Sequence, residues 1–221
     1  FTPSDAHQLT NISSGGAATP ETLSALYASK AGAAFPGGGW GMTETLGTGA
    51  AFTGHFCSHR PNASGFPSPI MEFSFLDEDG SPAAPGQPGE IHVRSSAAIQ
   101  QYHTGSTDGF HAGWLATGDV GYINDEGLLF ICGRVKDMII RGGENIYPSE
   151  IEACLLALPQ CLDAAVVGKP DAKWGEEVAA VLQVSDTTRG DSHVVIQHCR
   201  TQLAAFKVPA HVTFTEKPLP R

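Results

Sequence analysis

Long apolar runs are missing from this sequence, and no stretch approaches the roughly 20 residues that a membrane-spanning helix needs. Basic residues are scarce as well, with 13 Lys and Arg against 23 Asp and Glu. The resulting net charge of −10 argues against a nucleic-acid or anionic-membrane surface. A few well-placed Arg side chains or backbone N–H groups would still suffice to bind a phosphate locally.

Cys-x-x-Cys pairs, Gly-x-x-x-x-Gly-Lys phosphate loops and Gly-x-Gly-x-x-Gly dinucleotide fingerprints are also absent. The cysteines are odd in number and widely spaced; they are Cys57, Cys132, Cys154, Cys161 and Cys199. We expect them to be buried, reduced thiols of a cytoplasmic protein. The chain begins with Phe1 rather than Met, so the sequence leaves organelle targeting open.

Enough apolar material is present for a folded core, since 41% of the 221 residues are hydrophobic. This content predicts one large or two modest domains rather than disorder. Leu23, Leu26 and Tyr27 share one face of a helix predicted over residues 20–31, which the Gly- and Pro-rich run 35–39 ends. Residues beyond this run carry turn signals and little periodicity as far as Pro69.

Short strands bounded by turns follow, at residues 70–76, 91–95 and 128–135. They predict a small β-barrel or sheet over about residues 65–136, at the end of a large domain that spans residues 1–136. A small α+β domain is expected over residues 137–221. Its predicted elements are a helix from Pro148 to before Pro159, strands at 164–167, 178–184 and 212–214, and a helix capped by Asp191.

The segment from Gly133 to Glu152 is the most informative part of the chain. It reads Gly-Arg-Val-Lys-Asp-Met-Ile-Ile-Arg-Gly-Gly-Glu-Asn-Ile-Tyr-Pro-Ser-Glu-Ile-Glu. It opens as a strand edge that carries Arg134 and turns at Gly142 and Gly143. The two glycines allow a close backbone approach to something large, and Pro148 suits a first helical turn.

A second landmark is Gly-Trp-Gly-Met-Thr-Glu-Thr at residues 39–45. Trp40 offers a flat face on which a base can stack, and Thr43 offers a hydroxyl to a phosphate. Glu44 offers an oxygen ligand of the kind that Mg²⁺ prefers. Taken alone, the segment would be interpreted as a Gly-rich turn with a partly buried tryptophan.

A third landmark is Trp-Leu-Ala-Thr-Gly-Asp, which ends at Asp119. A carboxylate can accept two hydrogen bonds from vicinal hydroxyls, the geometry that a ribose presents. An isolated Thr-Gly-Asp is a weak signal, since Asp after Gly is usually a turn residue. Arg134 adds a rigid guanidinium fork that can bond hydroxyls or phosphate.

In this order and spacing the motifs resemble those of the acyl-adenylate-forming enzymes: acyl-CoA synthetases, luciferases and peptide-synthetase adenylation domains. The resemblance begins at Ser14-Gly15-Gly16-Ala17 and reaches Pro218-Leu219-Pro220-Arg221, so that it covers nearly the whole chain. It implies an α/β and α+β fold: part of a large adenylation domain that ends in a small β-barrel, then a small mobile C-terminal domain. The cofactors that it implies are ATP or AMP, Mg²⁺ and coenzyme A, with a small carboxylic acid as substrate.

The resemblance also implies a role for individual residues. Gly15, Gly16 and Ala17 would lie beside the adenine and acyl pocket. The nucleotide would further be bound by Gly41, by Trp40 at the adenine, Thr43 at the α-phosphate, Asp119 at the ribose and Arg134 at both ribose and phosphate. Glu44 would hold the metal, and Thr43, Glu44 and Arg134 would be the catalytic residues.

In the small domain Asp137 matches the hinge about which the family rotates this domain between its two half-reactions. Gly142 and Gly143 would line the pantetheine tunnel. Trp174 resembles an aromatic residue that flanks the tunnel in some CoA ligases, although a core position is an equally good interpretation. Lys207 is the candidate for a contact with CoA phosphates.

Two family elements are not found, and we expect them beyond the ends of the chain. The phosphate-binding loop would lie upstream of Phe1, and the lysine that catalyses adenylation would lie just past Arg221. We therefore interpret the chain as a fragment of an AMP-forming acyl-CoA ligase, inactive by itself, with a junction typical of fatty- or aryl-acyl-CoA ligases. The alternatives are a domain that loads an acyl-carrier protein and a non-catalytic nucleotide-binding relative.

Overall fold

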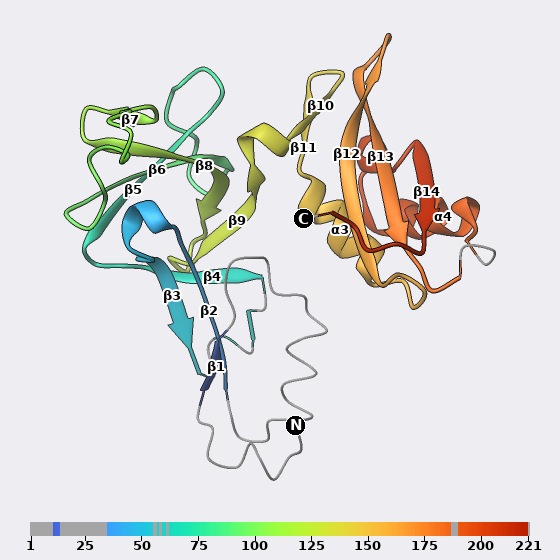
Figure 1. Cartoon of the computed structure of the whole chain (residues 1–221), viewed down its shortest axis with the longest axis horizontal. Helices are drawn as coiled ribbons and strands as arrows, with labels where there is room; N and C mark the ends of the chain where they lie inside the picture. Colours follow the sequence, from blue (N-terminus) through green and yellow to red (C-terminus); the bar gives the residue numbers. More distant parts are fainter. Residues whose placement is uncertain are drawn as a thin grey trace. The chain divides into compact units, whose positions relative to one another are not determined.

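The computed structural model describes residues 11–13, 35–54, 57, 59–60, 62–186 and 190–220. The predicted helix over 20–31 and the predicted nucleotide contacts Gly15, Gly16 and Ala17 lie outside these residues. The chain forms two compact units, Phe1–Ile131 and Cys132–Arg221 (Figure 1). The division between the units falls a few residues before Asp137 in the sequence, and a hinge at Asp137 stays a prediction.

One mixed sheet forms the described part of the first unit, with the order β1-β2-β3-β4-β9-β8-β6-β5 and β7 paired with β8. Its strands are β1 (Asn11–Ser13), β2 (Phe35–Gly41), β3 (Gly49–Thr53), β4 (Ala63–Pro67), β5 (Met71–Leu76), β6 (Gly89–Ser95), β7 (Phe110–His111), β8 (Trp114–Ile123) and β9 (Leu129–Arg134). β1 and β5 stand at opposite ends of this order, so the described residues show an open sheet and no closed barrel. Turn signals mark where strands end but not which strands pair, and closure depends on the pairing.

Further strands of this unit were not predicted from the sequence. The Gly- and Pro-rich run 35–39 belongs to strand β2, which pairs with β3 from Gly37 to Gly41. A side chain at Gly39 would bring its Cβ to 2.7 Å from the Ala50 carbonyl oxygen, so the glycine admits the neighbouring strand. The turn-rich stretch that follows contains β3 and β4.

Alternate residues of β6 supply the centre of this unit's core, as the period of two in a strand requires. Ile91 and Val93 are fully buried and pack with Leu115 of β8 and Leu129 of β9. The predicted strand signals for β5, β6 and β9 are confirmed within about two residues at each end.

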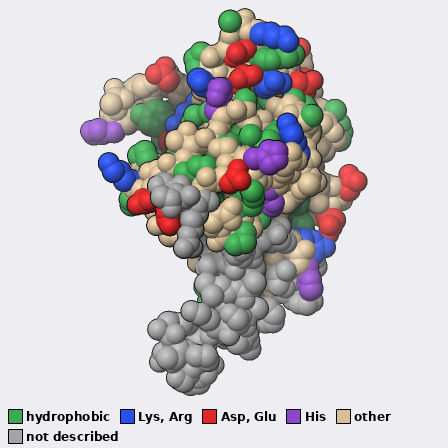
Figure 2. Space-filling view, turned by 90° about the vertical axis from the view of Figure 1, so that its right-hand side faces the viewer, with side chains coloured by type: hydrophobic (Ala, Val, Ile, Leu, Met, Phe, Trp, Pro, Cys, Tyr) green, Lys and Arg blue, Asp and Glu red, His purple; other side chains and the backbone are tan. Residues whose placement is uncertain are grey.

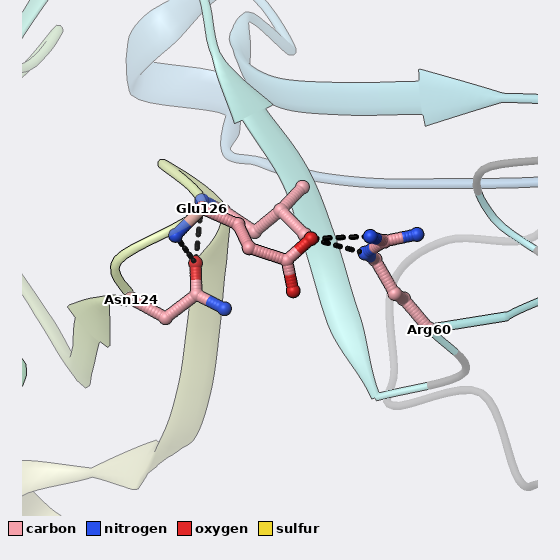
Figure 3. Close-up of polar contacts among 4 residues, drawn as sticks. Arg60, Asn124 and Glu126 are labelled. Carbon is pink, nitrogen blue, oxygen red and sulfur yellow. Dashed lines mark hydrogen bonds and ion pairs between the residues drawn. The ribbon is translucent and has the colours of Figure 1, made fainter.

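A polar contact joins the segment before β4 to the turn between β8 and β9 (Figure 3). The guanidinium of Arg60 donates to one oxygen of Glu126, and the Asn124 side chain accepts hydrogen bonds from the backbone N–H groups of Glu126 and Leu128. Asn124 thereby fixes the turn that carries Glu126, and β4 and β9 pair antiparallel beside it.

The described residues of the second unit form a five-stranded sheet with two helices, in the order β11-β10-β13-β12 and with β14 paired with β13. Its elements after the 3₁₀ turn η2 (Val135–Asp137) are β10 (Ile139–Arg141), β11 (Glu144–Ile146), α3 (Pro148–Leu156), β12 (Asp163–Asp171), β13 (Gly175–Gln183), α4 (Ser192–Gln202), η4 (Ala205–Lys207) and β14 (His211–Thr215). The predicted helices are confirmed, since α3 starts at Pro148 and the Asp191 carboxylate caps α4 by accepting from the His193 N–H at 2.8 Å.

The two helices share one core with this sheet. Ile151 and Leu155 of α3 pack with Val178 and Leu182 of β13 and with Val195 of α4, and all five are fully buried. On the face drawn in Figure 2, acidic, basic and hydrophobic side chains of the described residues are interspersed. Within the described chain, no helix combines the length and the hydropathy that crossing a membrane demands.

Candidate functional site

The Trp-Gly-Met-Thr-Glu-Thr segment forms the end of β2 and a tight 3₁₀ turn, η1 (Thr43–Thr45). Thr45 is fully buried, and its hydroxyl donates to the Met42 carbonyl and accepts from the Met42 N–H. These reciprocal bonds fix the turn so that Thr43 is exposed and Glu44 is half-buried. Nothing in the sequence pattern singles out Thr45, which holds the turn that carries the two neighbouring candidate ligands.

The glycines around Trp40 have steric reasons to be glycine. A Cβ at Gly41 would come within 2.5 Å of the Gly47 carbonyl oxygen, because the turn folds back on β2. A Cβ at Gly49 would come within 2.6 Å of the Trp40 ring. Gly41, predicted as a nucleotide contact, therefore also leaves room for the turn to fold back on β2. Gly49 leaves room for the indole ring of Trp40.

Tyr102 holds the side chain of Glu44. Its hydroxyl donates to the Glu44 carboxylate at 3.2 Å, and the Ile99 N–H donates to the Glu44 carbonyl at 2.8 Å. The Tyr102 ring packs edge-on against Phe110, with centroids 5.7 Å apart. Burial, and then the charge of Glu44, raises the pKa of Tyr102, so the phenol keeps its proton and remains a donor at neutral pH.

Asp119 lies in a strand rather than in the turn that Thr-Gly-Asp usually marks. β8 carries extra residues between the pairs His92↔Ala116 and Glu90↔Val120, so it bulges at residues 117–119. The bulge passes through Gly118 at φ 73°. Bulges re-aim side chains next to sites in this way.

Hydrogen bonds stabilise the bulge from within. The Thr117 hydroxyl donates to the Ile91 carbonyl at 2.8 Å and accepts from the Asp119 N–H at 3.1 Å. Asp119, whose carboxylate this geometry places, is only 9% exposed. Thr117 thus ties the carboxylate-bearing residue to the fully buried centre of β6.

One hydrogen bond joins the tryptophan and aspartate motifs, which lie 79 residues apart in the chain. The Trp40 indole N–H donates to the Asp119 carboxylate at 2.8 Å. The structure therefore brings Trp40, Thr43, Glu44 and Asp119 into one region of the first unit. This cluster offers an aromatic face, a hydroxyl and two carboxylates.

The remaining predicted residues belong to the second unit. Arg134 ends β9 and Asp137 ends η2, and both are exposed. Whether Arg134 joins the cluster around Asp119 stays a prediction. Lys207, the candidate for a contact with CoA phosphates, donates to Glu150 of α3 at 2.6 Å. In this structure it therefore forms an ion pair between η4 and α3.

A second cluster surrounds Trp174, which is 37% exposed and so does not belong to the core. The Arg141 guanidinium lies 4.7 Å and the Lys173 ammonium 4.4 Å from the ring centroid. Asp171 accepts from the N–H groups of Trp174 and Lys173, and these bonds lower the pKa of its carboxyl. The Gly142 N–H donates to the Trp174 carbonyl at 2.8 Å.

Gly142 and Gly143 differ in what a side chain would meet, and this difference gives a prediction. Both have positive φ, but a Cβ at Gly142 would lie 2.9 Å from the Trp174 ring, whereas a Cβ at Gly143 would meet nothing within 4 Å. We expect Gly143→Ala to destabilise by about 1–2 kcal/mol through backbone strain, and Gly142→Ala by about 1 kcal/mol more. Urea unfolding of the full-length protein, followed by tryptophan fluorescence, compares the two variants. Equal midpoints would contradict the packing argument.

The five thiols are unsuited to act as nucleophiles. All are unpaired, and burial raises the pKa of each, to about 11 for Cys132 and Cys161 and about 12 for Cys199. They therefore stay protonated at neutral pH, and the chain supplies no activated thiol of its own.

Comparison with known families decides the assignment. The AMP-binding enzyme family matches residues 2–103, and the AMP-binding enzyme C-terminal domain matches residues 150–221. The chain belongs to the AMP-forming acyl-adenylate synthetase superfamily. Among curated members, it is 35% identical over 219 residues to the long-chain-fatty-acid–CoA ligase FadD13 of Mycobacterium tuberculosis, covering 98% of this chain and 43% of that protein.

Other members of the superfamily match similarly. Feruloyl-CoA synthase of Amycolatopsis sp. is 34% identical over 216 residues, covering 96% of this chain and 44% of that protein. The structure of o-succinylbenzoate CoA synthetase (MenE) from Bacillus subtilis with the acyl-adenylate OSB-AMP superposes with a TM-score of 0.84 at 32% identity, covering 96% of this chain and 43% of that one. The chain therefore spans less than half of the length of these relatives.

Proposed function

We propose that this chain is part of an AMP-forming acid–thiol ligase that activates a carboxylic acid as acyl-AMP and transfers the acyl group to coenzyme A. The observation that supports this best is the Trp40–Asp119 hydrogen bond, because it joins an aromatic face to a carboxylate at one place. Those are the groups that an adenosine needs for its base and its ribose. The unpaired, protonated thiols further suggest a cytoplasmic location and an acceptor thiol that comes from outside the chain.

The chemistry follows from the fact that a carboxylate oxygen is a poor leaving group, which adenylation converts into the better leaving group AMP. Attack of the carboxylate oxygen on the α-phosphorus of ATP forms the acyl-phosphate bond and expels pyrophosphate. The thiol of coenzyme A then attacks the acyl carbon, AMP leaves, and the thiol proton passes to solvent. In both steps the protein has to hold the nucleotide and offset the charge on its phosphates.

Each part of the first-unit cluster has a place in this proposal. Trp40 packs on the adenine, the exposed Thr43 hydroxyl bonds the α-phosphate, and Asp119 accepts from the ribose hydroxyls. Glu44 fits a metal ligand, since its carboxylate is half-buried and oriented by Tyr102. Mg²⁺ bound there would offset phosphate charge.

The second unit would serve the thiol half-reaction as a small mobile α+β domain. We propose that Asp137 is its hinge, that Arg134 supports the ribose and phosphate, and that Gly142, Gly143 and Trp174 line the path of the pantetheine arm. The exposed Trp174 ring beside Arg141 supports this assignment.

The acyl group is proposed to be fatty or aromatic, because relatives are named as long-chain-fatty-acid–CoA, feruloyl-CoA and 2-succinylbenzoate–CoA ligases. The test is pyrophosphate release by the full-length protein with a panel of such acids, with and without coenzyme A. Release with at least one acid and acyl-CoA formation on adding coenzyme A are expected. No release with any acid would contradict the ligase assignment, and adenylation without CoA thioester would favour an acyl-carrier protein as acceptor.

Tyr102→Phe provides a separate prediction about the metal. Without the phenol donor, Glu44 loses the contact that orients its carboxylate, so the Mg²⁺ concentration for half-maximal pyrophosphate release should rise about tenfold. Tyr122→Phe is the matched control, because the Tyr122 ring stacks on Phe130 with centroids 5.3 Å apart. A Tyr102→Phe enzyme with the Mg²⁺ dependence of the wild type would show that Glu44 does not need this contact.

A further inference from the structure

We infer that Trp40 is a positioning residue for the ribose as well as an aromatic face: its indole N–H orients the Asp119 carboxylate toward the 2′- and 3′-hydroxyls. The inference rests on the proposed function, because it assumes that Asp119 accepts from the ribose. It adds a specificity role, which is that Trp40 sets the preference of the site for ribose over deoxyribose.

The indole is held where its N–H can act. Its ring packs at a tilt against Phe73, with centroids 5.8 Å apart, and lies over Gly49, where even a methyl group would collide with the ring. Trp40 is also the last residue but one of β2, and β2 is paired with β3 at this point. Packing against Phe73 and over Gly49 therefore holds the ring, and the pairing of β2 with β3 holds the backbone that carries it.

The carboxylate, in contrast, has a bond about which it can turn. The bulge and Thr117 fix the backbone of Asp119, but the terminal torsion of an aspartate is broad. The bond from Trp40 to Oδ2 at 2.8 Å selects one orientation of the carboxylate plane. A carboxylate has about four acceptor positions on its two oxygens, so the indole bond takes up only one of them.

Burial makes this donor important. Asp119 is 9% exposed, so water replaces the indole N–H poorly if it is removed. A phenylalanine at position 40 would keep an aromatic face for a base but would offer no donor. Trp40 therefore combines two functions that a phenyl ring would separate.

The test is the binding of AMP, 2′-deoxy-AMP and 3′-deoxy-AMP to the full-length protein by calorimetry. We expect Trp40→Phe to weaken AMP binding about tenfold, the contribution of one hydrogen bond to a charged group. The same substitution should weaken binding of the two deoxynucleotides much less, so the preference of the site for AMP over them should fall. An equal loss for all three nucleotides would show that Trp40 serves only as a face for the base and would overturn the inference.

A second variant removes the N–H with less change of shape. Benzothienylalanine at position 40 keeps a fused aromatic ring and replaces the N–H by sulfur, and it should reproduce the loss of ribose preference. Trp114→Phe is the control for replacing a tryptophan, since the Trp114 ring packs under the Arg94 guanidinium at 4.6 Å. If the benzothienyl variant keeps the wild-type preference, the inference is wrong.

Asp119→Ala distinguishes the failure of this inference from the failure of the proposed function. The double variant combines Trp40→Phe with Asp119→Ala. If Trp40 acts through Asp119, this variant should bind AMP no more weakly than Asp119→Ala alone, apart from a loss common to all three nucleotides. If Asp119→Ala itself keeps the preference for AMP, the proposed ribose contact fails. If Asp119→Ala loses the preference and Trp40→Phe keeps it, the positioning role alone fails.

Discussion

Asp119→Ala is expected to lower kcat/KM for ATP in pyrophosphate release by about 100-fold or more in the full-length protein. The carboxylate is proposed to accept from two ribose hydroxyls, and each hydrogen bond to a charged group contributes about 1.5–3 kcal/mol. Two such bonds correspond to at least a factor of about 100. The change also leaves the Trp40 indole N–H without its partner, so the loss should appear as weaker ATP binding together with slower turnover.

The control for this prediction is Asp125→Ala, which removes an exposed carboxylate from the turn between β8 and β9. That variant should keep the wild-type rate and unfold at the wild-type temperature. Near-wild-type turnover with unchanged ATP affinity in Asp119→Ala would remove the ribose contact from the proposal.

Asp137→Pro is expected to separate the two half-reactions. Asp137 is exposed and ends the 3₁₀ turn η2, where the chain enters the second unit. Proline fixes φ near −65°, so it restricts rotation of the backbone at this residue. We expect pyrophosphate release without coenzyme A to stay within about twofold of wild type, while acyl-CoA formation falls by about 100-fold or more.

Asp137→Ala is the matched variant, since it removes the same carboxylate without restricting φ. It should retain most of both half-reactions in rapid-quench measurements. If Asp137→Pro lowers adenylation and thioester formation by the same factor, the hinge lies elsewhere.

Local chemistry in the sequence predicted several elements well. Pro148 marked the start of α3, the Asp191 side chain capped α4, and glycine turns bounded β5, β6 and β9. These signals act over a few residues, so no tertiary structure is needed to interpret them. The motif order likewise placed the chain in its superfamily.

Other elements were not predicted, because their conformation depends on distant partners. The Gly- and Pro-rich run 35–39 carries no strand signal, yet it lies in a strand because β3 approaches it closely and supplies its hydrogen bonds. The Thr-Gly-Asp tripeptide looks like a turn, yet it is a bulge because β6 pairs on both sides of it. The open sheet follows from pairings between strands far apart in the sequence.

The sequence by itself determined the kinds of group available: an aromatic ring at Trp40, a hydroxyl at Thr43, and carboxylates at Glu44 and Asp119. Only the tertiary structure decided which of them meet. The contacts Trp40–Asp119 and Tyr102–Glu44 join residues 79 and 58 positions apart. Separations of that size are closed by the pairing of strands and the packing of loops against them, and no local propensity records which strand will lie beside which.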